Sequence, residues 1–92
     1  MNDSGWRRFL KLCLSSKNEK DLSLLFDLFL TPEEKENLAL RCLIIEELLK
    51  QKKTQRDIAE DLHVSIAKIT RGSNELKRMP VSLIDFLKAN IK

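Results

Sequence analysis

TQRDIAEDLHVSIAKITRGSNELK, residues 54–77, predicts two short helices separated by a sharp corner. Thr54 is a candidate N-cap of the first helix, and Asp57 follows three residues later in a variant of the capping box. Ser65 is a candidate N-cap of the second helix. Between the helices lie His63 and Val64, which leaves room for a tight turn alone. Two helices joined in this way have the outline of a DNA-binding helix-turn-helix.

Apolar residues at helical spacing give each of these helices an inward face. They are Ile58, Ala59 and Leu62 in the first helix and Ile66, Ile69 and Leu76 in the second. Gly72 interrupts the second pattern, and a glycine inside a helix costs about 1 kcal/mol relative to alanine. Close approach of another group to the backbone would justify it. Arg71 beside it favours an anion as that group, since a guanidinium matches a carboxylate or phosphate.

The outer residues of the second helix suit DNA. A recognition helix reads bases from residues near its N-terminal end, and the candidates are Ile66, Ala67, Lys68, Thr70 and Arg71. Lys68 opposes the helix dipole, which a nearby phosphate would offset. Arg56 in the first helix is a further phosphate or base candidate. The alternative is that Lys68 and Arg56 are ordinary solvated residues.

The remaining sequence predicts more helices and no second domain. Helices are expected from Trp6 to about Ser16, from Asp21 to Phe29, from Pro32 to about Lys50, and from Pro80 at N1 onward. Residues 1–5 are expected to fray. Thr31-Pro32-Glu33-Glu34 is a strong helix start, with Thr31 as N-cap and Glu34 completing a capping box. The third helix carries two apolar stripes, so it is expected at the centre.

Composition favours a helical oligomer. The 92-residue chain contains two glycines, two prolines and no tyrosine, which favours an all-α fold. The helix expected from Asp21 to Phe29 is apolar nearly all round, and one small chain cannot easily cover such a helix. We therefore expect a six-helix domain over residues 1–92, with dimerisation helices at about 6–50 and the helix-turn-helix at about 54–77, in an intertwined homodimer.

The charge distribution, the cysteines and the missing motifs favour some functions and argue against others. Residues 1–49 carry 7 basic and 9 acidic side chains and residues 50–92 carry 10 and 5, so the C-terminal half suits a polyanion. Cys13 and Cys42 are expected to be buried, reduced thiols. One histidine supports no metal site, and catalytic motifs are absent, so no enzyme is expected. No signal core or membrane-spanning run is present, which predicts a cytoplasmic protein without a membrane partner.

The helix-turn-helix, with IAKITRGSNELK after TQRDIAEDL, resembles that of the tryptophan repressor family. LFLTPEEKENLALRCLIIEELL resembles the central helix of that family, including Arg41, and the resemblance runs from about Trp6 nearly to the C-terminus. It implies an effector site in which Arg41 and Arg71 sandwich the indole of L-tryptophan, and Arg71 also pairs with its carboxylate. The further implied ligand contacts are Gly72, Glu75, Thr31, and the carbonyls of Leu28 and Leu30 from the other subunit.

The chain departs from the family pattern in three places. Glu75 stands where the family has a serine, and it could accept from the ligand ammonium or fold back on Arg71. His63-Val64-Ser65 replaces a glycine-rich turn. Side chains at these positions should stiffen the turn relative to glycines and make the orientation of the helix-turn-helix less dependent on ligand. Ala59 replaces a lysine that would contact a phosphate. Ion pairing of Arg41 with a nearby acid and of Arg71 with Glu75 is the structural alternative to ligand binding.

The resemblance therefore implies a repressor that binds double-stranded operator DNA as a homodimer, with L-tryptophan as corepressor and no cofactor, controlling genes of tryptophan biosynthesis or uptake. One alternative is a related regulator that answers another ligand or none. Another is a helical protein-interaction module that does not bind DNA.

Overall fold

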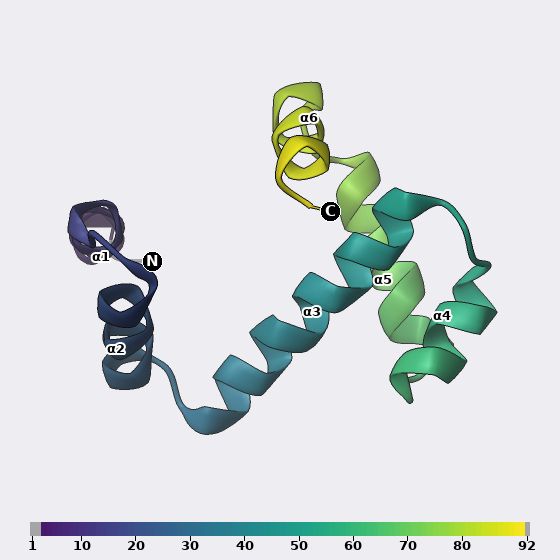
Figure 1. Ribbon diagram of the computed structural model, residues 1–92, viewed down its shortest axis with the longest axis horizontal. Helices are drawn as coiled ribbons and strands as arrows, with labels where there is room; N and C mark the ends of the chain where they lie inside the picture. The colour runs from purple at the N-terminus through teal and green to yellow at the C-terminus, as the bar shows by residue number, and fades with distance from the viewer. Residues whose placement is uncertain (1–2, 92) are drawn as a thin grey trace. The chain divides into compact units, whose positions relative to one another are not determined.

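The structure is a computed structural model that describes residues 3–91. Within that range the chain forms six α-helices and no strand (Figure 1). The helices are α1 (Asp3–Ser15), α2 (Glu19–Phe29), α3 (Pro32–Lys50), α4 (Gln55–Leu62), α5 (Ile66–Lys77) and α6 (Val81–Asn90). The predicted all-α, six-helix class is confirmed. The helices gather into two compact units, one ending at Asn37 and the other beginning at Leu38.

The first unit is built on aromatic contacts between α1 and α2. The ring of Phe9 lies 6.0 Å from that of Phe26 and 5.4 Å from that of Phe29, and Trp6 stacks on Phe9 at 5.7 Å. Such ring pairs add modest stability beyond the area they bury. Neither helix contains a fully buried residue. The contact of α1 with α2 therefore leaves most of their apolar surface uncovered within the single chain.

The first two helices begin earlier than the sequence predicts. α1 begins at Asp3 and not at Trp6, so residues 3–5 belong to a helix, while residues 1 and 2 of the predicted frayed segment lie outside the described range. α2 begins at Glu19 because the side chain of Asn18 caps it, accepting the backbone N–H of Asp21 at 2.8 Å. Asparagine is a favoured N-cap.

The predicted start of α3 is confirmed in both of its hydrogen bonds. The backbone N–H of Glu34 donates to the hydroxyl of Thr31 at 3.1 Å, and the backbone N–H of Thr31 donates to the Glu34 carboxylate at 2.8 Å. This is the reciprocal arrangement of a capping box. The bond from the Thr31 backbone lowers the pKa of Glu34 below its ordinary value, because it favours the charged carboxylate.

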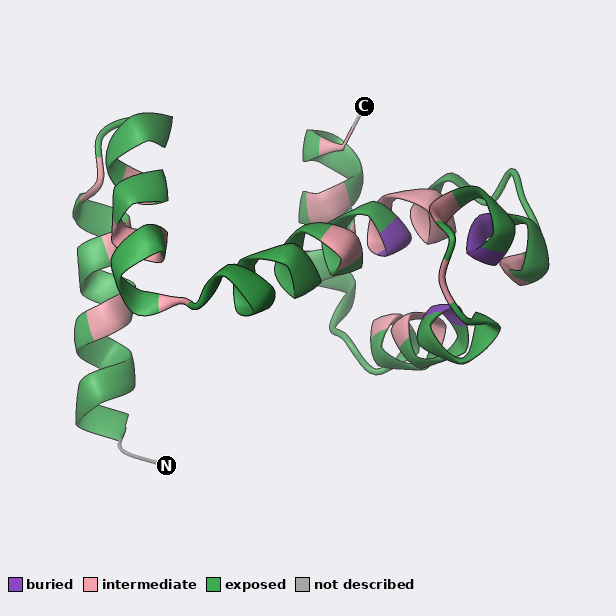
Figure 2. Cartoon of the chain, turned by 90° about the horizontal axis from the view of Figure 1, so that it is seen from below, coloured by how far each residue is buried: buried purple, intermediate pink, exposed green. Residues whose placement is uncertain are grey.

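The second unit holds the core, which lies where α3, α4 and α5 meet (Figure 2). Its buried members are Ile44, Ile58, Ala59 and Ile69, with Leu40, Leu48, Leu62 and Val64 packed against them. A β-carbon built at Gly72 would lie 3.1 Å from Cγ2 of Ile44 and 3.4 Å from Cδ1 of Leu48. Gly72 therefore allows α5 to pack closely on α3, which accounts for a glycine in mid-helix.

The corner of the helix-turn-helix is a Schellman motif. His63 adopts the left-handed conformation, with φ 57° and ψ 45°. The N–H of Val64 donates to the carbonyl of Ala59 at 3.0 Å, and that of His63 donates to the carbonyl of Glu60 at 3.2 Å. This pair of bonds satisfies the last carbonyls of α4. Ser65 occupies the N-cap position of α5, as predicted, although its side chain makes no capping hydrogen bond.

Two further expectations are corrected in the second unit. Pro80 is the N-cap of α6 and not its first residue, because its backbone is extended at ψ 151° while its carbonyl accepts the first N–H of the helix, from Leu83. Cys42 is exposed and Cys13 is half-buried, so neither is a buried thiol, although both are free. Among residues 3–91, no helix is long and apolar enough to cross a membrane.

Candidate nucleic-acid interface and effector site

The predicted DNA-binding residues lie on exposed surface of the helix-turn-helix. Ile66, at the start of α5, is 49% exposed, so it does not belong to the inward face that the sequence predicts. Ala67, Lys68 and Arg56 are exposed as well. No ion pair of Lys68 or Arg56 occurs within residues 3–91. Arg56 lies in the first turn of α4 and Lys68 in the first turn of α5, where a bound anion is favoured.

Thr70 is held by a residue that the sequence prediction left out. Its hydroxyl lies 2.9 Å from the side-chain oxygen of Gln55 and 3.1 Å from the carbonyl of Ile66. Gln55 is the first residue of α4, so this contact ties the N-terminal end of α4 to the first turns of α5. A glutamine next to the predicted N-cap was visible in the sequence, but its partner 15 residues later was not.

The two arginines of the predicted effector site lie beside the contact between α3 and α5. Arg71 is next to Gly72 along α5. On α3, the side chain of Ile45 approaches Gly72, and Arg41 lies one turn before Ile45 on the same face. Both arginines are exposed. Neither makes a hydrogen bond or ion pair with its side chain among residues 3–91, so the acid partner considered for Arg41 is not found there.

Glu75 pairs with a cation that the sequence analysis did not consider. Its carboxylate accepts a hydrogen bond from Nη1 of Arg78 at 3.0 Å. Arg71 lies one turn before Glu75 on the same helix and is not paired with it. The alternative in which Arg71 folds onto Glu75 is therefore not the arrangement found in the structure.

The other predicted ligand residues lie in the first unit, at the junction of α2 and α3. The carbonyl of Leu28 would normally receive the backbone N–H of residue 32, but that residue is Pro32, which has none. Leu30 ends α2, and its N–H donates to the carbonyl of Phe26 at 2.8 Å. The junction therefore presents the negative end of the α2 dipole.

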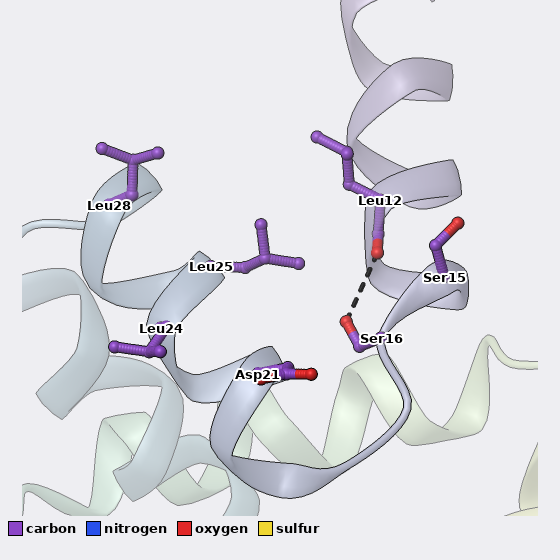
Figure 3. A pocket seen from close by; sticks show the side chains of 7 residues that line it. All are labelled: Leu12, Ser15, Ser16, Asp21, Leu24, Leu25 and Leu28. Carbon is purple, nitrogen blue, oxygen red and sulfur yellow. Dashed lines mark hydrogen bonds between the residues drawn. The ribbon is translucent and has the colours of Figure 1, made fainter.

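The first unit contains a groove that none of the predicted DNA-binding residues lines. Figure 3 shows it between the last turn of α1 and α2. Its lining is Leu12, Ser15, Ser16, Asp21, Leu24, Leu25 and Leu28. Leu24 is 57% exposed and Leu28 is 77% exposed. Leucines left open in this way form a surface that another apolar surface could cover.

An ion network fixes the segment that joins α3 to α4. The ammonium of Lys53 lies 2.6 Å from the carboxylate of Asp61 on α4 and 3.6 Å from that of Glu47 on α3. The hydrogen bond to Asp61 is the main reason why the pKa of Lys53 is raised. Gln51, which follows α3, takes a positive φ of 54°. The network ties α4 of the helix-turn-helix to the C-terminal part of α3.

Comparison with known proteins identifies the family of this chain. The family model described as Trp repressor protein matches residues 4–91. The chain is 48% identical over 89 residues to a Trp operon repressor homolog of Chlamydia trachomatis serovar D, a match that covers 97% of this chain and 95% of that protein. It is 47% identical to the Trp operon repressor homolog of Chlamydia caviae, over 95% of this chain and 86% of that one. With the Vibrio parahaemolyticus homolog it shares 42% identity, over 90% of this chain and 81% of that one. These matches span the helix-turn-helix, α3 and both arginines, and the chain belongs to the Trp repressor family.

Proposed function

We propose that this chain is a homodimeric DNA-binding repressor that L-tryptophan activates as corepressor. The curated relatives are named Trp operon repressor homologs, and the match extends over nearly the whole chain. The observation that carries the proposal is the unpaired guanidinium of Arg71 on α5, beside the contact with α3. A free, exposed arginine on the recognition helix can bind a ligand carboxylate and report it to the DNA-binding face.

The effector site in this proposal takes residues from two subunits. Arg41 and Arg71 stack on the two faces of the indole, and Arg71 binds the carboxylate. The hydroxyl of Thr31 accepts from the N–H of Glu34, which leaves its hydrogen free to donate to the same carboxylate. The carbonyls of Leu28 and Leu30, contributed by the other subunit, accept from the ammonium, because they lie at the negative end of α2.

Dimerisation is part of the proposal because the first unit leaves its apolar surface open. Trp6, Leu14, Leu24 and Leu28 are all more than half exposed in the single chain, and neither α1 nor α2 buries a residue fully. A two-helix unit without a core is not stable by itself in water. A second copy of the chain would cover this surface and carry the second helix-turn-helix needed for a two-fold operator.

The mechanism that we propose is a shift between two orientations of the helix-turn-helix. Tryptophan binds the orientation in which both copies of α5 fit successive major grooves, about one helical turn apart. In this orientation, Lys68 and Arg56 neutralise phosphates. Ile66 and Ala67 contact base edges, and Thr70, whose hydroxyl contacts Gln55, faces the DNA with them. The ligand changes DNA affinity by its preference for that orientation.

The test is calorimetry of L-tryptophan with the wild-type chain and with Arg71→Ala. We expect the wild type to bind and the variant to lose binding at least tenfold, because the carboxylate loses its charged partner. Lys77→Ala, which removes an exposed charge farther along the same helix, should bind as the wild type does. Equal affinity of the wild type and Arg71→Ala would refute the site.

A related regulator that answers another ligand is the second candidate, and Glu75 is the feature that favours it. A carboxylate stands there in place of the family serine, so the site could prefer a ligand with a different arrangement of charges. Titration with the twenty amino acids distinguishes the two candidates. A tighter complex with an amino acid other than tryptophan would favour the second.

A further inference from the structure

Three charged residues follow one another along the last turns of α5. They are Arg71, Glu75 and Arg78 in the order cation, anion, cation, at spacings of four and three residues. Both spacings bring side chains together on a helix surface. Glu75 therefore has a cation within reach on either side, and it can satisfy one of them at a time with a close ion pair.

The structure contains the pair with Arg78. Nη1 of Arg78 lies 3.0 Å from the carboxylate of Glu75. Two physical effects favour this choice. An acid that precedes its base along the helix makes the better pair. Arg78 is also the C-cap residue of α5, where the helix dipole favours a positive charge. Pairing in the opposite direction, with Arg71, has neither advantage.

We propose that Arg78 is a positioning residue for the effector site: by holding Glu75, it keeps the guanidinium of Arg71 free for the ligand carboxylate. The inference rests on the proposed function of Arg71. Without Arg78, the carboxylate of Glu75 would turn to the cation one turn before it and compete with the ligand there. Glu75 is half exposed, and Arg78 is 74% exposed, so both side chains can rearrange without repacking the core.

A double-mutant cycle at Glu75 and Arg78 tests the proposal. Affinity for L-tryptophan is measured by calorimetry, without DNA, for the wild type, Arg78→Gln, Glu75→Gln and the double variant. We expect Arg78→Gln to bind roughly two- to fivefold more weakly, the range that an exposed ion pair supports. In the Glu75→Gln background, the same change should have no effect, because no carboxylate remains to occupy Arg71.

Lys77→Gln is the matched control. It removes one positive charge next to Arg78 and should leave the affinity at the wild-type value. If Arg78→Gln weakens binding equally in both backgrounds, Arg78 acts by its charge alone and the proposal is overturned. An unchanged affinity of Arg78→Gln in the presence of Glu75 overturns it as well.

A second measurement tests, without any ligand, whether Arg78 controls the pairing of Arg71 with Glu75. The Nε–Hε signal of Arg71 is followed by NMR in the same four proteins. We expect Arg78→Gln to shift this signal and slow its exchange with water, and the added Glu75→Gln change to reverse both effects. If tryptophan fails to bind the wild type, the proposed function fails, and this signal still decides whether Arg78 controls the pairing of Arg71. An unaltered signal in Arg78→Gln would overturn the inference.

Discussion

At the scale of single residues, the cations of the second unit fall into two groups. Lys50, Lys53 and Arg78 pair with acids on or next to their own helices. Arg41, Arg56, Lys68 and Arg71 have no such partner within residues 3–91. All four were predicted to bind tryptophan or DNA, although Lys52, Lys77 and Lys88 are also without an ion pair among the described residues. Because a free cation needs no internal pair to be broken, the four predicted residues are available to external anions.

His63, at the corner of the helix-turn-helix, has a backbone conformation that glycine adopts more easily. It holds a left-handed conformation that costs an ordinary residue about 1–2 kcal/mol and glycine very little. We expect His63→Gly to raise the free energy of unfolding by about 0.5–1 kcal/mol, after the entropy cost of glycine in the unfolded chain. Urea unfolding followed by circular dichroism measures the difference. His63→Ala keeps the β-carbon and should bring no gain; an equal gain in both variants would contradict this explanation.

At the scale of helices, α5 has an inner side that packs on the core and an outer side that is open to solvent. Its inner residues, Ile69 and Gly72, pack on α4 and α3, while its first turn, including Lys68, carries no acidic side chain that would repel a phosphate. Packing therefore fixes the angle at which the outer residues are presented. We therefore expect changes to the inner residues of α5 to alter stability, and changes to its outer residues to alter the proposed DNA binding.

Replacing Lys68 should weaken DNA binding through the salt-dependent part of the affinity. We expect Lys68→Ala to make the slope of log affinity against log salt concentration shallower by about one unit for each subunit whose Lys68 contacts a phosphate. Fluorescence anisotropy of a labelled duplex at several salt concentrations measures the slope. Lys35→Ala, which removes a lysine paired with Asp27 in the first unit, should leave the slope unchanged. A slope unaffected by Lys68→Ala would remove this residue from the phosphate contacts.

The sequence predicted helices well where capping residues mark their ends. Thr31 and Thr54 stand at the N-caps of α3 and α4 as expected. It was less successful at α2, because Asn18 was hidden in a polar stretch that also suits a loop. The choice of Glu75 between two arginines could not be predicted, since both spacings allow a pair and the difference between them is small. Gln55 was missed because its partner is distant in sequence.

At the scale of the whole molecule, the main feature is that each unit leaves large apolar side chains exposed. On α6, Val81 is 74% exposed and Phe86 is 61% exposed, and α1 and α2 bury no residue fully. A soluble domain rarely leaves this much large apolar side chain in water without a partner. The buried core of the second unit is small, so association with a second copy would provide a large part of the stability.

A charge placed on this surface should separate the subunits. We expect the wild type to sediment as a dimer at micromolar concentration, and Leu24→Glu to sediment as a monomer with reduced helix content, because a buried, unpaired carboxylate opposes association. Ser23→Glu adds the same charge at a neighbouring exposed position of α2 and should remain dimeric. A monomeric wild type in analytical ultracentrifugation would contradict the dimer.

The central claim is that L-tryptophan controls DNA binding by this chain. The most direct measurement takes a duplex selected from a random pool in the presence of L-tryptophan and determines its affinity with and without the amino acid, at fixed salt. The proposal predicts at least several-fold tighter binding with L-tryptophan and no such change in Arg71→Ala. Equal affinity with and without L-tryptophan in the wild type would contradict the claim.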